Sequence, residues 1–174
     1  MSTFNVKNKN KRPSQYSIGY LGLIYDSVLE AKVSEVLGDK VLYRGGNPYD
    51  TKVLLGGKLV DRPANQYFKK LVVQYQGKTW HTIPDFQIKG AKGCYIEAKG
   101  NLDKRSRLNI AGMLNVGRCI GVVFISEAAA LQPLWPGCQV SKAQWLQNRG
   151  VPFVCDPSEA GTLIELVKQK QEVL

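Results

Sequence analysis

One stretch, residues 84–100, constrains this chain more than any other. Two short apolar runs flank a turn of sequence Lys-Gly-Ala-Lys-Gly. Apolar runs on either side of a glycine-rich turn predict two paired strands, here over residues 82–88 and Cys94–Lys99. The rest of the fold has to accommodate this pair.

Charged side chains converge on one face of that hairpin. Because strand side chains alternate between faces, Tyr95, Glu97 and Lys99 share one face of the returning strand. Asp85 lies on the partner strand, close enough to share a site with Glu97. Two carboxylates and one ammonium group are therefore expected to meet on the sheet. The opposite face carries three apolar residues, Cys94, Ile96 and Ala98.

The chemistry of this group favours a metal site. Mg²⁺ and Mn²⁺ prefer oxygen ligands, commonly one or two carboxylates together with substrate phosphate and water. Asp85 and Glu97 can supply the carboxylates, and Lys99 can hold the attacking water or neutralise charge on a phosphate. The same residues also occur on the solvated face of an ordinary hairpin, so the pattern alone leaves both interpretations open.

Composition limits the classes of binding partner that this chain is expected to have. A length of 174 residues favours one domain with a core, and 44% of the residues are hydrophobic. A net charge of +10 favours a polyanionic partner. No apolar run is long enough for a membrane helix, so we expect nucleic acid rather than a membrane.

The four cysteines form no Cys-x-x-Cys pair, which argues against structural zinc and fits a reducing cytoplasm. His81, the only histidine, is structural or contacts substrate.

The first 15 residues are polar and basic, and we expect a disordered arm there. It either solubilises the protein or, the interpretation we favour, follows phosphates when DNA binds. Its cations are Lys7, Lys9, Lys11 and Arg12.

A helix is predicted from Ser27 to about Leu37, because an apolar residue recurs at every fourth position. Ser27 and Glu30 have the spacing of a capping box. Glu30 is therefore either part of the cap or a third acidic ligand, and spacing alone does not separate the two.

Further strands and helices are predicted on either side of the hairpin. Residues 39–80 are rich in strand-like runs, including a hairpin around Gly57. The helix after Gly100 begins with a basic cluster, which either contacts the DNA backbone or forms a solvated face. Residues 119–126 predict a strand buried on both faces, followed by a loop over residues 127–140 and two more helices. The cations of the basic cluster are Lys104, Arg105 and Arg107.

These segments, in this order, resemble the phage endonuclease I family, the Holliday-junction resolvases of T-odd bacteriophages, within the PD-(D/E)xK nuclease superfamily. The likeness covers roughly residues 25–156. It includes the first-helix segment 27–34, the Ile-Pro-Asp-Phe and Ile-Glu-Ala-Lys-Gly segments, the buried Val-Phe-Ile-Ser strand and the closing segment 143–156. The stretch between Glu30 and Asp85 is longer here than in the family.

The resemblance implies an α/β fold with a restriction-endonuclease-like core, a central mixed β-sheet flanked by helices. It implies one nuclease domain over residues 16–174, in which residues 39–80 bridge the two chains of a homodimer with exchanged strands. The implied catalytic residues are Glu30, Asp85, Glu97 and Lys99, and the implied metal ligands are Asp85, Glu97, the carbonyl of Ala98, and Glu30.

The function expected from this resemblance is Mg²⁺- or Mn²⁺-dependent resolution of branched DNA by phosphodiester hydrolysis, in the host cytoplasm if the protein is phage-encoded. Two alternatives remain from the residues. One is a nicking or restriction-like nuclease that acts on ordinary duplex DNA, and the other is a non-catalytic basic DNA-binding protein on the same scaffold.

Overall fold

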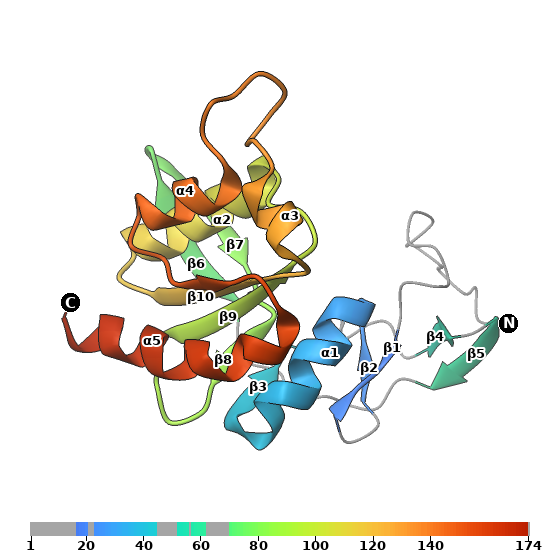
Figure 1. Ribbon diagram of the computed structural model, residues 1–174. Coiled ribbons are helices and arrows are strands. Elements are labelled where there is room, and N and C mark those ends of the chain that lie inside the picture. The colour runs from blue at the N-terminus through green and yellow to red at the C-terminus, as the bar shows by residue number, and fades with distance from the viewer. Residues whose placement is uncertain (1–16, 21–22, 45–51, 56, 62–69, 174) are drawn as a thin grey trace, which may run out of the picture.

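A mixed five-stranded sheet forms the centre of the computed structural model, which describes residues 17–20, 23–44, 52–55, 57–61 and 70–173 (Figure 1). Three parallel strands occupy one side of the sheet, and two antiparallel strands follow on the other. In spatial order the strands are β11 (Phe153–Val154), β10 (Cys119–Phe124), β9 (Cys94–Lys99), β8 (Phe86–Ile88) and β3 (Val41–Tyr43). The predicted central mixed sheet flanked by helices is confirmed.

Helices cover both faces of this sheet (Figure 1). On one face, α1 (Val28–Leu37) and α5 (Ala160–Glu172) pack with the sheet around one apolar cluster. On the other face, α2 (Lys104–Asn115), α3 (Glu127–Leu131) and α4 (Lys142–Gln147) surround a second cluster. The sheet therefore separates two cores, and its central strands are buried from both sides.

The alternation predicted for β9 is confirmed by these two cores. Cys94, Ile96 and Ala98 belong to the cluster with α1 and α5, whereas Tyr95 belongs to the cluster with α2. All residues of the neighbouring strand β10 are buried, as its continuous apolar sequence predicts. Because β9 lies between β8 and β10, the acidic side chain of Glu97 is carried into a buried position.

Helix α1 begins at the predicted serine cap and ends at a glycine. The Ser27 side chain accepts a hydrogen bond from the backbone N–H of Glu30. The apolar stripe is buried against the sheet and consists of Leu29, Val33 and Leu37. Gly38 follows with φ +56°, a left-handed conformation that glycine adopts without strain.

A separate hairpin packs on α2, formed by β6 (Leu71–Tyr75) and β7 (Lys78–Thr82). The close approach of this hairpin to α2 depends on Gly112, because a Cβ there would lie 3.0 Å from Trp80 and 3.1 Å from Val73. The Trp80 indole N–H also donates to Asn109 Oδ1 at 2.8 Å. The hairpin thus covers part of the second core.

The remaining elements are short. They are β1 (Ser17–Ile18) paired with β2 (Ile24–Tyr25), β4 (Lys52–Leu55) paired with β5 (Lys58–Asp61), and the 3₁₀ turns η3 (Gly38–Lys40) and η4 (Pro157–Glu159). The predicted hairpin around Gly57 is confirmed by β4 and β5. The predicted basic arm, residues 1–15, lies outside the described residues.

Two predictions of local structure are wrong. Residues 82–88 do not form one strand, because β7 ends at Thr82 and β8 begins only at Phe86. Pro84 interrupts the run, and Asp85 lies at the bend between the two strands. Residues 127–140 are not all loop, since Ser126 caps the short helix α3 by accepting from the backbone N–H of Ala129. Among the described residues, no helix combines the length and the apolar character needed to cross a membrane.

Candidate active site

Asp85 and Glu97 meet at the C-terminal end of β9. Phe86, the first residue of β8, pairs with Ile96 of β9. Asp85 directly precedes Phe86 in the chain. The backbone N–H of Ala98 donates to Asp85 Oδ2 at 2.9 Å. Both carboxyl groups are buried, with Asp85 3% and Glu97 4% exposed. The carboxylate pair predicted from the hairpin is therefore present, although Asp85 lies at a bend and not within a strand.

Lys99 faces both of these carboxylates. Its ammonium nitrogen lies 2.8 Å from Glu97 Oε2 and 3.9 Å from Asp85 Oδ2. The close pair is an ion pair whose geometry is not that of a hydrogen bond, so Glu97 Oε2 has no hydrogen-bond partner among the described residues. A buried carboxylate oxygen without such a partner is available to a further ligand.

Glu30 reaches the same region from α1. Its carboxylate accepts hydrogen bonds from the Tyr43 hydroxyl at 2.7 Å and from the Ser27 hydroxyl at 3.1 Å. The predicted capping box is only half present: Ser27 caps the helix, but the Glu30 side chain turns towards Tyr43 instead of the Ser27 backbone. Glu30 is 6% exposed, unlike a residue that only caps a helix at the surface.

Arg44 connects Glu30 to the hairpin carboxylates. Its guanidinium lies 3.2 Å from Asp85 Oδ1, 3.7 Å from Glu30 Oε1 and 3.3 Å from Asp26 Oδ2. The backbone N–H of Arg44 also donates to the carbonyl of Asp85 at 2.9 Å. One cation thus bridges three carboxylates, and we call the whole group the charged cluster: Asp26, Glu30, Arg44, Asp85, Glu97 and Lys99.

Burial and mutual repulsion control protonation in this cluster. Burial, and then the neighbouring Asp85 carboxylate, raise the pKa of Glu97 to about 8. The same two causes raise the pKa of Glu30 to about 7. For Asp85, burial opposes ionisation, but Lys99 and Arg44 outweigh it and hold the pKa below its ordinary value. Asp85 is therefore the group that stays ionised.

Lys99 remains an ammonium group. Burial alone would lower the pKa of Lys99, but Glu97 and then Asp85 raise it above its ordinary value. A lysine in this state donates hydrogen bonds and carries positive charge, and it does not accept a proton. It can therefore orient a water molecule or a phosphate oxygen.

The donor set fits a hard divalent cation. When every group is ionised, the four carboxylates and two cations of the charged cluster leave a formal charge of −2. One Mg²⁺ or Mn²⁺ ion balances that charge, and carboxylate oxygens are its preferred ligands. Among the residues that the structure describes, no three His, Cys, Asp or Glu side chains are grouped to hold a metal by themselves. Because Arg44 bridges Glu30 and Asp85, a role for Glu30 as a shared metal ligand stays a prediction. A ligand role for the Ala98 carbonyl stays a prediction as well.

The cluster opens into a cleft of about 510 Å³, which we call the carboxylate cleft. Asp85, Glu97 and Lys99 line its floor, and further basic side chains lie around them. Arg44 of the charged cluster also lines the cleft, and the remaining basic residues of its lining are Lys70, His81 and Arg105. A cleft whose buried carboxylates are surrounded by basic side chains can hold a phosphodiester through those surrounding cations.

The predicted basic cluster divides between two sites. Arg105 lines the carboxylate cleft, whereas Lys104 and Arg107 line a neighbouring groove. Lys104 and Arg105 are exposed, but Arg107 is half-buried and donates to the carbonyls of Leu102 and Leu134. The arm residues predicted to contact DNA, Lys7, Lys9, Lys11 and Arg12, lie outside the described residues.

Sequence reasoning missed Arg44, Tyr43 and Asp26. Tyr43 and Arg44 come at the end of a three-residue strand, and no motif marks them. They join the cluster only because β3 pairs with β8, which places Tyr43 opposite Phe86. Pairing between strands so far apart in sequence is not indicated by local pattern.

No known protein-family model matches this sequence, and no curated protein matches it either.

The raised pKa of Glu97 predicts a pH-dependent stability in chelator-treated protein. The carboxyl group binds its proton more tightly in the folded state, from an ordinary pKa of 4.5 to about 8. Its stabilisation is complete below the unfolded pKa and is lost as pH rises towards 8. Glu97→Gln removes this titration, so between about pH 5 and about pH 8 the wild type should lose at least about 1.4 kcal/mol more unfolding free energy than the variant. Urea unfolding at the two pH values measures the difference.

Glu165→Gln is the matched control, because Glu165 is exposed and its carboxylate pairs with Lys168 outside the charged cluster. It should follow the wild type at both pH values. Equal pH dependence in the wild type and Glu97→Gln would contradict the assigned protonation.

Proposed function

We propose that this protein is a metal-dependent endonuclease that cuts branched DNA, with four-way junctions as its substrate class. The observation that carries the proposal is the buried group of Asp85, Glu97 and Lys99 on the floor of a cleft bordered by cations. A restriction-endonuclease-like core is part of the proposal. It is supported by a mixed central sheet whose strand β9 carries both Glu97 and Lys99.

The chain's own residues have separable roles in this reaction. Asp85 stays ionised and, with Glu97, would supply carboxylate oxygens to Mg²⁺ or Mn²⁺. The bound ion would stabilise charge on the attacking and leaving oxygens of the phosphodiester. Lys99 holds the hydrolytic water or a phosphate oxygen by donating a hydrogen bond. Arg44 keeps Asp85 and Glu30 in place through its three ion pairs.

Binding rests on different residues from chemistry. Lys70 and Arg105 lie at the carboxylate cleft and Lys104 at the neighbouring groove, where each can contact the DNA backbone. Phosphate contacts carry no sequence information. Recognition by shape, such as that of a junction, is the mode that this arrangement supports.

The first prediction of the proposed function separates chemistry from binding. Glu97→Gln and Asp85→Asn should each abolish Mg²⁺-dependent cutting of a four-way junction, because each removes a carboxylate oxygen donor. Junction binding in chelator should stay within about twofold of wild type, since it depends on contacts to phosphates. Gel assays of cutting and of binding measure the two properties on the same DNA, with Glu165→Gln as the active control.

Each other outcome has a definite meaning. Cutting at the wild-type rate by either variant contradicts the assigned site. Equal cutting of linear duplex and junction by the wild type supports a nicking or restriction-like enzyme. Binding without any cutting in Mg²⁺ or Mn²⁺ supports a non-catalytic DNA-binding protein.

The second prediction concerns the exposed cations of α2. Lys104→Ala and Arg105→Ala should each weaken junction binding, and the slope of log K against log salt should shrink by about 0.9 for each lost phosphate contact. Arg107 is left intact because it donates to the carbonyls of Leu102 and Leu134. Lys89→Ala is the control, since this exposed lysine lies in the turn that precedes β9. A slope that is unchanged in both variants would show that these residues only solvate the helix.

The third prediction concerns a homodimer with exchanged strands. Within the described chain, Glu30, Tyr43 and Arg44 all come before residue 45. Glu30 contacts Tyr43 and Arg44, and Arg44 in turn contacts Asp85. Exchange through the predicted bridging segment, residues 39–80, would therefore carry Glu30 of one chain to Asp85 of the other. A two-fold dimer would present two identical sites to the two symmetric strands of a junction.

The test mixes two inactive proteins, Glu30→Ala and Lys99→Ala, after joint unfolding and refolding. With exchange, a mixed dimer has one site with both lesions and one intact site, so nicking returns. Without exchange every site keeps one lesion and the mixture stays inactive. A monomeric mass at micromolar concentration would contradict the dimer itself.

A further inference from the structure

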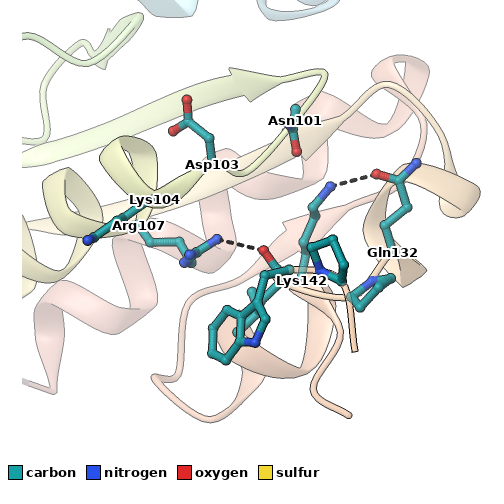
Figure 2. Close-up of a pocket in the computed structure, with 10 residues that line it drawn as sticks. Asn101, Asp103, Lys104, Arg107, Gln132 and Lys142 are labelled. Carbon is teal, nitrogen blue, oxygen red and sulfur yellow. Dashed lines mark hydrogen bonds between the residues drawn. The ribbon is translucent and has the colours of Figure 1, made fainter. Parts of the chain in front are cut away.

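A second groove lies beside the carboxylate cleft, between the first turn of α2 and the loop of residues 132–140 (Figure 2). We call it the loop groove, and its volume is about 810 Å³. Asp103 lines both the loop groove and the carboxylate cleft, so the two are adjacent along the connection from β9 to α2. A DNA strand that leaves the carboxylate cleft can therefore enter the loop groove.

The wall formed by the loop presents an aromatic surface. Trp135 is 56% exposed, and the guanidinium carbon of Arg107 lies 5.9 Å from the centre of its ring. Arg107 also donates to the carbonyl of Leu134 at 3.3 Å and to that of Leu102 at 2.9 Å. Its guanidinium therefore links the loop to the chain that leaves β9, and this link holds the Trp135 segment beside the groove.

The loop groove carries an excess of positive charge. Three cations and one carboxylate line it: Lys104, Arg107, Lys142 and Asp103. Lys142 is only 4% exposed, and its ammonium donates to Gln132 Oε1 at 2.6 Å (Figure 2). Within the described part of the chain no carboxylate pairs with Lys142. A buried ammonium whose partner is a neutral amide retains the capacity to attract an anion.

An exposed indole next to uncompensated cations fits one class of ligand, an unpaired nucleotide. Aromatic side chains stack on unpaired bases of any sequence, and lysines hold the adjoining phosphates. Bases inside a duplex already stack on one another and do not reach such a ring. Branched DNA supplies unpaired or distorted nucleotides where its strands part.

We propose that the loop groove binds an unpaired nucleotide of the DNA strand, with its base stacked on Trp135 and its phosphate near Lys104 and Lys142. The proposal rests on the proposed function, since it concerns the same DNA. It adds that the protein prefers substrates with a single-stranded segment next to the cut, and it assigns that preference to a surface outside the charged cluster.

The test compares two DNA probes in chelator, where no cutting occurs: a duplex with a single-stranded thymidine flap and the same duplex with flush ends. Trp135→Ala should weaken flap binding by about 10-fold, the typical loss of one base–aromatic stack, and should leave flush-duplex binding unchanged. Trp135→Phe keeps an aromatic ring and should retain most of the affinity for the flap. Leu131→Ala removes another exposed apolar side chain that does not line the groove, and it should bind both probes like the wild type.

A second measurement uses the fluorescence of the wild-type protein. A single-stranded thymidine oligonucleotide should quench part of its tryptophan emission, and that part should be absent in Trp135→Phe, which keeps Trp80 and Trp145. Equal quenching in both proteins, or equal affinity of wild type and Trp135→Ala for the flap, would overturn the proposal. Because both measurements are made without cutting, they can succeed even if the junction assay shows no nuclease, and they can fail while that assay succeeds.

Discussion

The bridge from Arg44 to three carboxylates is the interaction on which the rest of the site depends. Asp26 and Glu30 come from α1 and the residues just before it, whereas Asp85 comes from the bend before β8. Carboxylates that are buried without cations would be strongly destabilising. Arg44, at the end of β3, supplies positive charge at the place where these segments meet. The pairing of β3 with β8 and the packing of α1 on the sheet thus support the same charged cluster.

Apolar packing explains why those charges are buried at all. Strand β9 lies between two hydrophobic cores, and its alternating side chains enter both of them. At its C-terminal end the alternation continues, but Glu97 takes the place of an apolar residue on the α2 side. Burial then raises the pKa of Glu97, and the charge of Lys99 offsets only part of that effect. The same strand therefore stabilises the sheet and sets the protonation of the site.

The sequence predicted the parts of the site that depend on local period, and it failed where distant segments pair. Two-residue alternation placed Glu97 and Lys99 on one face, and proximity in a hairpin placed Asp85 beside them. The apolar run over residues 82–88 predicts one strand, but Pro84 interrupts it, as proline does within strands. Glu30 was ambiguous, because its cap is local but its contact with Tyr43 is not. Arg44 has no local signal at all, since its role requires β3 to lie beside β8.

The basic start of α2 shows how helical geometry divides one run of charge between two sites. Residues three or four apart in a helix share a face, whereas adjacent residues point about 100° apart. Lys104 and Arg107 are three apart and both line the loop groove, while Arg105 and Asn109 are four apart and both line the carboxylate cleft. The cluster that reads as one basic patch in the sequence is thus two half-patches on either side of Asp103. Any ligand that spans both cavities would therefore meet Arg105 in the carboxylate cleft and, beyond Asp103, Lys104 and Arg107 in the loop groove.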